Sequence, residues 1–537
     1  MVGSDNKQPR TKLLVEMRPA LDGFAGIPQE VRLLFRGLRS IPGVDVEGLL
    51  QTSQRFLYRG MPEKTPRRRK ARANALNRYS KVIVSLAEQP HENVFDRLAQ
   101  YVHRRMSAFW LAMLTNTRIG KIRLGRFESK EFGDFTWRTL FAKSLPARDF
   151  DTVAFANHRI CSIPWKAMHQ AGLSTLAWRR TALYPKISTS SIDVFIGQTP
   201  YPGRVSSGTA MVIRYHDAIP VLMPHTIPEK SVHQATHFRA LEANVRDGAW
   251  FACVSEATRQ DLLKIFPAAE PKAVTIHNMV SHNYYPEESN VDAVSRVVRS
   301  RLYEKSGWLP KFLTNREKEH FYNKNLDSSN FRYLLMVSTI EPRKNHTRLI
   351  AAWDYIKANV DPDLKLVIVG TLGWDNDAIH SALSNWIERG QAFMLNAVPA
   401  GALRTLYRNA AATICPSLGE GFDFSGVEAM RSGGVTIASD IPVHREVYDD
   451  AAVYFDPYSM MSLAGALQDT LYGERSSQVI EELRHRGAEV SSRYLPEAIL
   501  PQWDAFLAMV TNKHRASLFP PKADQPRADS VPLEIAA

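Results

Sequence analysis

The stretch ATICPSLGEGFDFSGVEAM, residues 412–430, joins a short apolar run to an irregular loop and then to a helical pattern. ATIC predicts a buried strand, and VEAM predicts a short helix. Ser425 and Glu428 fit the S-x-x-E pattern of a capping box, with Ser425 as the N-cap. Glu420 has no such structural role. A carboxylate in a loop between a strand and a helix more often binds hydroxyl groups or takes part in acid–base chemistry, so this loop is a candidate ligand site.

The same strand–loop–helix order recurs along the whole chain. Apolar runs of four to seven residues include IDVFIG (192–197) and AMVIRY (210–215) in the first half, and YLLMVS (333–338) and LKLVIVG (364–370) in the second. Continuous apolar runs of this kind are typical of parallel strands covered by helices on both faces. The sequence therefore predicts an α/β protein with two doubly wound, Rossmann-like domains facing each other across a cleft, and a basic, largely helical insertion in the first.

Composition shifts and apolar periodicity suggest where the domains begin and end. The expected segments are a disordered start at 1–12, a first domain at 13–285 with an insertion at about 51–190, a linker at 286–330, a second domain at 331–500, a final helix at 501–516 that packs back on the first domain, and a disordered tail at 517–537.

The formal charge of +13 is concentrated in one part of the 537-residue chain. Residues 55–126 hold 17 Lys and Arg and four acids, a net charge that equals that of the whole protein. The three cysteines show neither a disulfide framework nor a zinc-ligand spacing, which suits a reducing compartment. No signal peptide is visible, and AFWLAML (108–114) is too short to span a bilayer. We expect a cytoplasmic protein, either free or peripheral on the inner face of the cytoplasmic membrane.

The basic segment allows two interpretations that the sequence leaves open. Arginines mixed with Phe109, Trp110 and Met113 suit an anionic membrane surface. The same pattern fits a helical subdomain whose apolar face is core and whose charges are solvated. A nucleic-acid binder is a third class, but no RRM, zinc-finger or KH pattern supports it, so no nucleic-acid partner is expected.

A second candidate site follows the strand at 333–337. In STIEPRKNH (338–346), Arg343 and Lys344 precede a helix whose expected N-cap is Asn345. Two cations at the carboxyl end of a parallel strand, beside a helix N-terminus, are well placed to neutralise a diphosphate.

The spacing of these motifs resembles that of the retaining GT-B glycosyltransferases of family 4, the mannosyltransferase-like group 1 enzymes. EPRKN precedes E-x7-E by about 76 residues, with LVIVG between them, and the similarity continues through SDIPVHREV. It covers about 330–500 well. The first domain fits more loosely, through GFAG before a helix, HDAIP after a strand and VSEATRQDLL.

The resemblance implies a role for each matching residue. Arg343 and Lys344 would hold the diphosphate of the donor, Glu428 would accept hydrogen bonds from the ribose, and Glu420 would face the transferred sugar. Lys344, Glu420 and the strand-end His216 would form the catalytic group. The remaining implied contacts are the backbone N–H groups of Phe424, Ser425 and Gly426, the phosphate-facing turn of Gly23 and Gly26, and Asp217 on the acceptor side.

The resemblance also implies a reaction, although this chain departs from the family's sequence pattern, among other places in the loop that holds Asp423. The donor would be a nucleotide diphosphate sugar, with GDP-mannose favoured and a rhamnosyl or other hexosyl donor as the alternative. The acceptor would be lipid-linked or a growing polysaccharide, and neither a cofactor nor a metal is expected. Asp423 and Ser425 stand where the family commonly has glycine and proline. A carboxylate at position 423 would repel a diphosphate unless it faced the sugar. A catalytically inactive scaffold is disfavoured because the charged residues are retained.

Overall fold

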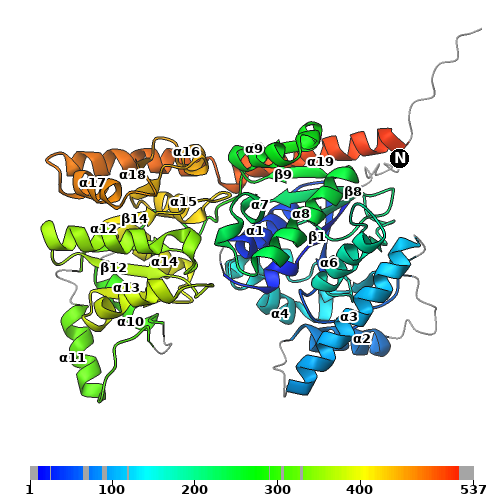
Figure 1. The fold of residues 1–537 in the computed structure, drawn as a ribbon, viewed down its shortest axis with the longest axis horizontal. Helices are drawn as coiled ribbons and strands as arrows, with labels where there is room; N and C mark the ends of the chain where they lie inside the picture. The colour runs from blue at the N-terminus through cyan, green and yellow to red at the C-terminus, as the bar shows by residue number, and fades with distance from the viewer. Residues whose placement is uncertain are drawn as a thin grey trace, which may run out of the picture.

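The computed structural model describes residues 10–24, 26–63, 72–87, 94–117, 120–288, 291–303, 307–326 and 331–518. Two sheets of mainly parallel strands stand side by side, each covered by helices (Figure 1). The prediction of two doubly wound α/β domains is therefore confirmed. Among the helices of the described residues, none combines the length and the apolar character that a bilayer crossing requires.

The first sheet runs in the order β10-β9-β8-β7-β1-β2-β5-β4. Its strands are β1 (Thr11–Glu16), β2 (Val44–Leu50), β4 (Gly125–Phe127), β5 (His158–Ile160), β7 (Val194–Gly197), β8 (Ala210–Tyr215), β9 (Trp250–Cys253) and β10 (Ala273–Thr275). β4 pairs antiparallel with β5, while the other described pairs are parallel. Every residue of β8 is buried, because helices cover both faces of the sheet.

Alternate side chains of the first sheet enter two cores, as the period of a strand requires. Leu13 and Val15 pack with α1 and α19, whereas Leu14 packs on the opposite face with α8 and α9. The helices around this sheet are α1 (Ile27–Ser40), α6 (Trp165–Ser174), α7 (Ile219–Leu222), α8 (Lys230–Arg246), α9 (Glu256–Ile265) and α19 (Pro496–Leu518).

The second sheet runs in the order β13-β12-β11-β14-β15-β16, and its strands are parallel. Its strands are β11 (Tyr333–Val337), β12 (Lys365–Val369), β13 (Ala392–Leu395), β14 (Ala412–Cys415), β15 (Thr436–Ser439) and β16 (Ala452–Phe455). Its helices are α10 (Val291–Ser300), α11 (Asn315–Asn325), α12 (His346–Asn359), α13 (Asp377–Glu388), α14 (Ala400–Asn409), α15 (Phe424–Arg431), α16 (Pro442–Tyr448), α17 (Met460–Tyr472) and α18 (Ser476–Ser492). The strand order reverses between β11 and β14, and ligands bind at such switch points.

The segment at about 51–190 is not an insertion throughout. It supplies β4 and β5, which extend the main sheet beyond β2. A strand pair at the sheet edge gains backbone hydrogen bonds that a separate insertion would lack. The rest of the segment holds α2 (Arg72–Leu86), α3 (Val94–Asn116), β3 (Lys121–Ile122), α4 (Gly133–Thr136), α5 (Phe150–Val153), α6 and β6 (Lys186–Ile187).

The ordered chain extends further at both ends than the sequence predicted. β1 begins at Thr11, inside the segment expected to be disordered, and α19 begins at Pro496 and continues to Leu518. α19 is long because Trp503 and Phe506 pack into the core of the first sheet. In Figure 1 this helix, drawn in red, lies along the first domain. Residues 1–9 and 519–537 lie outside the described residues.

One buried ion pair ties α1, the first sheet and α19 together. The Arg214 guanidinium on β8 donates to Glu30 at 2.9 Å, to the carbonyl of Ile276 at 2.6 Å and to Asn278 at 2.7 Å. The same group lies over the ring of Trp503, 5.3 Å from its centroid. Burial raises the pKa of Glu30 and lowers that of Arg214, and each partner opposes the shift of the other. The pair therefore depends on both members being present.

We expect Arg214→Met to destabilise the first domain by about 3–5 kcal/mol, because Glu30 would remain buried without its cation. The double variant Arg214→Met/Glu30→Leu should regain much of this loss, since it leaves no unpaired charge. Urea unfolding followed by circular dichroism measures both. Equal stability of the single and double variants would show that the pair contributes little.

Candidate active site

The predicted site residues come together at the carboxyl ends of three strands. The loop after β11 holds Arg343 and Lys344, and the loop after β14 holds Glu420, on the two sides of the switch point. From the first sheet, β8 ends just before His216 and Asp217. Carboxyl ends of parallel strands share one edge of a sheet, so loops distant in sequence become neighbours.

Glu420 is the centre of the charged cluster. One of its oxygens lies 3.0 Å from Arg343 Nη1, and the other accepts a short bond from Lys344 Nζ. Only 8% of its side chain is exposed. Burial alone would raise the pKa of Glu420, but the charges of Arg343 and Lys344 outweigh it and lower the pKa. Glu420 is therefore ionised, and the two cations predicted to hold a diphosphate are held in place by this carboxylate.

Arg343 carries further partners. Its guanidinium donates to Glu341 at 2.7 Å and to the carbonyl of Gly419 at 2.6 Å. Burial would lower the pKa of Arg343, yet the negative charges of Glu420, Glu341 and Asp217 raise it. Asp217 itself accepts a bond from the Ile219 N–H at 3.0 Å, and burial raises its pKa. Asp217, Glu341 and Glu420 thus all act on Arg343, and Lys344 is the second cation of the cluster.

The expected cap at Asn345 is only partly correct. Asn345 occupies the N-cap position of α12 with φ of 60°, but its side chain makes no capping bond. Instead the amide nitrogen donates to the carbonyls of Pro416 and Pro457. A side chain that reaches neighbouring loops cannot also cap its own helix. Asn345 thus ties the β11 loop to the β14 loop and helps to place the cluster.

His216 lies at the end of β8 and is 8% exposed. Burial, with a smaller effect of the Arg214 charge, lowers the pKa of His216 to about 3. The imidazole is therefore neutral at physiological pH. Among the described residues, its Nε2 has no hydrogen-bond partner. A buried polar nitrogen without a partner is costly, which favours its use by a ligand.

Glu428 does not form the predicted capping box. Its Oε1 accepts a bond from Gln29 Nε2 at 2.7 Å, and its Oε2 accepts from the Tyr407 hydroxyl at 3.2 Å. Gln29 belongs to the first domain, so this bond joins the two domains. Burial raises the pKa of Glu428 to about 7, although its hydrogen bonds with Gln29, Tyr407 and Tyr284 oppose the shift. Glu428 is 3% exposed, so its carboxylate is reached from solvent only if a neighbouring side chain moves.

The cap of α15 is Asp423, not Ser425. Asp423 takes a φ of 60°, and its carboxylate accepts from the Ser425 N–H at 3.2 Å, so the helix begins at Phe424. His444 Nε2 lies 3.3 Å from the other carboxylate oxygen. Burial would raise the pKa of Asp423, but His444 and Lys344 hold it far below its usual range. The carboxylate expected to repel a diphosphate is thus balanced by His444 and Lys344.

The predicted glycines occupy different environments. Gly23 and Gly26 have φ of 44° and 70° in the turn that leads into α1 and Gln29, so the turn lies near Glu428. Gly426 lies against Tyr448, where a Cβ would be 2.3 Å from the ring. Close packing explains Gly426 without a ligand. The ring of Phe424 stacks edge-on against Phe422, at 5.3 Å between centroids.

The EGFDF loop also forms the interface between the domains. The carbonyl of Gly421 accepts from Ser255 Oγ at 2.7 Å, and Ser255 is the N-cap of α9. Glu446 of the second domain accepts from the N–H groups of Glu256 and Ala257 at the start of the same helix. The N-terminus of α9 is thus capped from the other domain.

Sequence reasoning missed Gln29, His444 and Glu446. His444 and Glu446 stand in SDIPVHREV, a segment that carried the family resemblance but no assigned role. The unusual Asp423 was the one available signal for a nearby cation. Gln29 and Glu428 are 399 residues apart, and nothing local in the sequence connects them.

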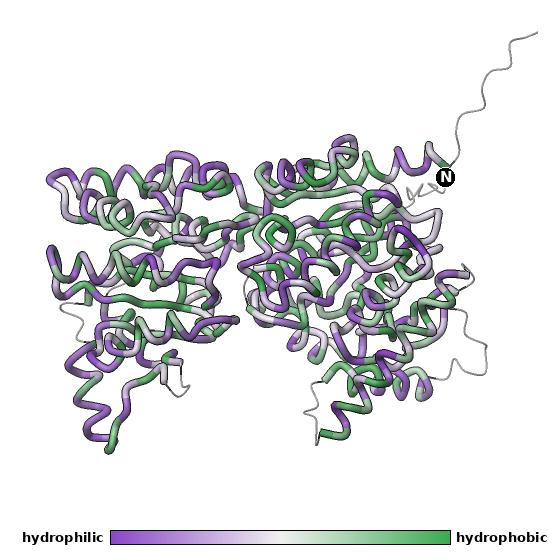
Figure 2. The backbone as a smooth tube through the Cα atoms, in the orientation of Figure 1, coloured by the Kyte–Doolittle hydropathy of each residue, from purple (hydrophilic) through white to green (hydrophobic). Residues whose placement is uncertain are grey.

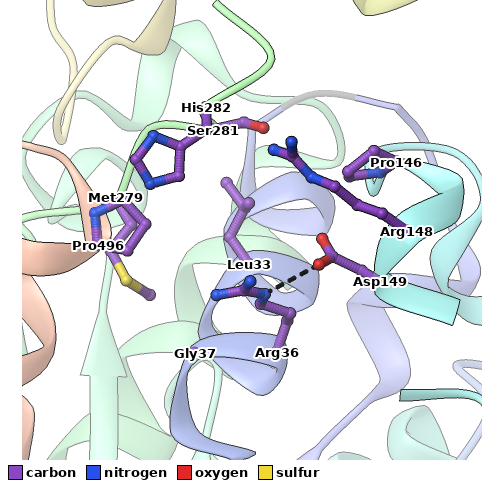
Figure 3. A pocket seen from close by; sticks show the side chains of 10 residues that line it. All are labelled: Leu33, Arg36, Gly37, Pro146, Arg148, Asp149, Met279, Ser281, His282 and Pro496. Atoms are coloured by element: carbon purple, nitrogen blue, oxygen red, sulfur yellow. Dashed lines mark hydrogen bonds and ion pairs between the residues drawn. The ribbon is translucent and has the colours of Figure 1, made fainter. Parts of the chain in front are cut away.

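A pocket separate from these residues lies between α1, residues 146–149 and residues 279–282 (Figure 3). Arg36 pairs with Asp149 there at 3.2 Å, and Arg148 and His282 also line it. Asp149 already balances Arg36, and no residue predicted to contact the donor lines this pocket. The charged cluster at the switch point therefore remains the candidate site.

Comparisons with known proteins agree with this architecture. Residues 317–487 match the family Glycosyl transferases group 1. The chain is 33% identical over 138 residues to serotype-specific mannosyltransferase WbdA of Escherichia coli, covering 26% of this chain and 17% of that protein. It is 23% identical over 260 residues to O-antigen chain mannosyltransferase B of Escherichia coli, covering 48% of this chain and 61% of that protein. The chain thus spans only part of the length of these relatives.

The fold is also similar to that of a solved structure, a sucrose-phosphate synthase from Thermosynechococcus elongatus. The TM-score is 0.53 at 14% identity, and the match covers 94% of this chain and all of the other. The family match confirms the predicted resemblance to the group 1 glycosyltransferases for residues 317–487, and the structural similarity agrees with the predicted two-domain fold.

We expect Gly421→Ala to open the domain interface. A Cβ at this position would lie 1.8 Å from the carbonyl oxygen of His216, and backbone atoms cannot move aside cheaply. The overpacking should cost about 1–3 kcal/mol and increase the radius of gyration measured by small-angle X-ray scattering. Gly401→Ala is the matched control, because a Cβ there meets nothing within 4 Å. An unchanged radius in both variants would contradict this interface.

The raised pKa of Glu428 predicts a pH-dependent stability. The carboxyl group ionises near its ordinary value of 4.5 in the unfolded chain and near 7 in the folded protein. The folded state therefore binds the extra proton in this window, and stability falls as pH rises through it. In the parent, the free energy of unfolding should fall by about 3 kcal/mol between acidic and mildly alkaline pH because of this group, and in Glu428→Gln this part of the fall should be absent. Urea unfolding at the two pH values measures the difference. The same pH dependence in both proteins would assign the titration to another group.

Proposed function

We propose that this chain, which carries a domain of the group 1 glycosyl transferase family, moves a hexose from a nucleotide diphosphate sugar to a lipid-linked or polysaccharide acceptor. The donor we favour is GDP-mannose, and the setting is surface glycan synthesis at the inner face of the cytoplasmic membrane. The observation that carries the proposal is the Arg343–Lys344–Glu420 cluster at the switch point of the second sheet.

Arg343 and Lys344 would bind the diphosphate and stabilise the charge that develops on it as the glycosidic bond breaks. Fixed cations aimed at a leaving group are usually the largest catalytic contribution. Glu420, which orients both cations, would accept hydrogen bonds from hydroxyl groups of the transferred sugar. Cations that neutralise the diphosphate make a metal ion unnecessary, so we propose a metal-independent reaction.

The donor ribose would bind Glu428 in place of Gln29. A carboxylate is a suitable acceptor for two ribose hydroxyl groups, and Gln29 occupies one of its oxygens in this structure. Donor binding would thus exchange a contact between the domains for a contact with the nucleotide. The turn at Gly23 and Gly26, which precedes Gln29, would face the diphosphate after this exchange.

His216 and Asp217 would act at the reacting carbon and on the acceptor side. The neutral imidazole of His216 has a free Nε2 that can bond a sugar hydroxyl. The transition state would have oxocarbenium character. We propose that the acceptor attacks from the face that the diphosphate leaves, with a diphosphate oxygen taking its proton, so that the configuration is retained.

The mannosyl donor and the glycan acceptor rest on the relatives. Two of them are named as mannosyltransferases, and one of these as acting on an O-antigen chain. The chain matches 17% of the first relative's length and 61% of the second's, so donor and acceptor remain proposals for this protein.

The proposal is tested by measuring nucleotide release from GDP-mannose, UDP-glucose and dTDP-rhamnose, with and without a lipid extract as acceptor. We expect turnover of GDP-mannose that survives EDTA. Lys344→Ala should lower kcat by about 10²–10³. The charge-matched control is Lys264→Ala, which removes an exposed lysine paired only with Asp261 among the described residues.

Two results would contradict the proposal at different levels. Turnover of UDP-glucose alone would overturn the choice of donor but would not contradict the assignment as a transferase. No turnover of any donor, with no thermal stabilisation by GDP or UDP, would overturn the transferase itself.

A further inference from the structure

Helix α3 exposes a continuous apolar stripe. Its large apolar side chains recur every three or four residues, which places them on one side of the helix. These residues are Phe95, Leu98, Val102, Met106, Phe109 and Met113. All are exposed, from 43% for Met113 to 80% for Phe95. The stripe therefore runs over most of the 23-residue helix without a partner among the described residues.

The side of α3 that is buried consists of small residues. Ala108, Ala112 and Thr115 are the residues of this helix that are buried, and α3 packs against α6. Arg179 fixes the end of the helix by donating to Asn116 Oδ1 at 2.7 Å. The interpretation of the apolar face as core holds for Ala108, Ala112 and the partly buried Leu111, which pack toward the core, but not for the stripe. The six large side chains of the stripe face outward.

Positive charge lies on the same two helices as the stripe. Besides the arginines Arg97, Arg104 and Arg105 of α3, the adjacent α2 carries Arg78, Lys81 and Arg72, of which Arg72 pairs with Glu131 at 2.7 Å, and Asp96 is the one acidic residue in the two helices. Arg104 donates to Gln54 at 3.4 Å, and Arg105 to the Tyr101 hydroxyl at 3.0 Å. Within the described residues, the three arginines of α3 form no ion pair with a carboxylate. Their charge is available to an anionic partner.

The two helices lie at the margin of the molecule. In Figure 1, α2 and α3 form the lower outer edge of the first domain, away from the second domain. Figure 2 shows apolar and polar stretches alternating along these helices rather than a polar surface. A flat surface could thus contact α3 without blocking the switch-point cluster between the domains.

We propose that α3 lies in the surface of an anionic lipid bilayer, with the apolar stripe at the acyl boundary and the arginines among the phosphate headgroups. A helix with an apolar and a basic side binds in the interfacial plane, because its apolar side chains leave water and its positive charges attract anionic headgroups. At 1.5 Å per residue, α3 would lie along about 35 Å of membrane. The contact would hold the enzyme beside a lipid-linked acceptor.

A second copy of this chain is a poorer occupant of the stripe. Pairing α3 with its own copy would bring two sets of arginines together with one aspartate on each side. Like charges in a buried interface are unfavourable, whereas anionic headgroups complement them. The charge of α2 adds to the same effect. The balance of charge therefore selects the lipid surface.

The test is flotation of the full chain with vesicles of phosphatidylcholine alone or rich in phosphatidylglycerol. We expect binding to the phosphatidylglycerol vesicles that weakens with salt and is much weaker on phosphatidylcholine. The triple variant Phe95→Ser/Val102→Ser/Phe109→Ser should bind at least about tenfold more weakly. The matched control, Val232→Ser/Leu313→Ser/Met461→Ser, removes the same number of exposed apolar side chains elsewhere and should bind like the parent.

Three outcomes would overturn the inference. They are no binding of the parent chain, equal binding of both triple variants, and a parent dimer, seen by light scattering, that the α3 variant converts to a monomer. The last would assign the stripe to a second copy. Vesicle binding is measured without turnover, so the result does not depend on the proposed donor.

Discussion

Buried carboxylates that lie beside basic side chains shape the centre of the molecule. Glu420 is held by Arg343 and Lys344 and Glu30 by Arg214, while Asp423 lies beside His444 and accepts a bond from the Ser425 N–H. In the first two cases the partner comes from another strand–helix unit, so each pair fixes a loop or helix against a distant one. The second sheet's switch point is ordered in this way, with Asn345 adding neutral bonds between the same loops.

The domain interface is held mainly by hydrogen bonds in which one partner is a neutral side chain or a backbone group, rather than by buried ion pairs. Gln29 donates to Glu428, Ser255 donates to the Gly421 carbonyl, and Glu446 caps the start of α9. Such bonds are individually modest and can be exchanged for bonds to a ligand. The interface is therefore suited to opening around a ligand, whereas the buried ion pairs stabilise the packing within each domain.

The basic region of the N-terminal domain combines an exposed apolar stripe, which is costly in water, with exposed positive charge, which water solvates. α3 turns its small residues inward and its large apolar residues outward, and it carries arginines without carboxylate partners among the described residues. Arg67 to Lys70, the densest part of the basic block in the sequence, lie outside those residues. The described helices alone are sufficient to define an apolar and cationic surface.

The sequence by itself determined the sheet architecture and the meeting of EPRKN with the acidic loop. These follow from local apolar runs and from the rule that loops after parallel strands share one edge. Only the tertiary structure decided that Asp423 rather than Ser425 caps α15, that Glu428 faces Gln29, and which side of α3 is buried. The reason is physical: those outcomes depend on partners far away in the chain, such as Gln29 at 399 residues from Glu428, and on which face of a helix meets a neighbour. Neither leaves a periodicity or a local pattern from which it could be predicted.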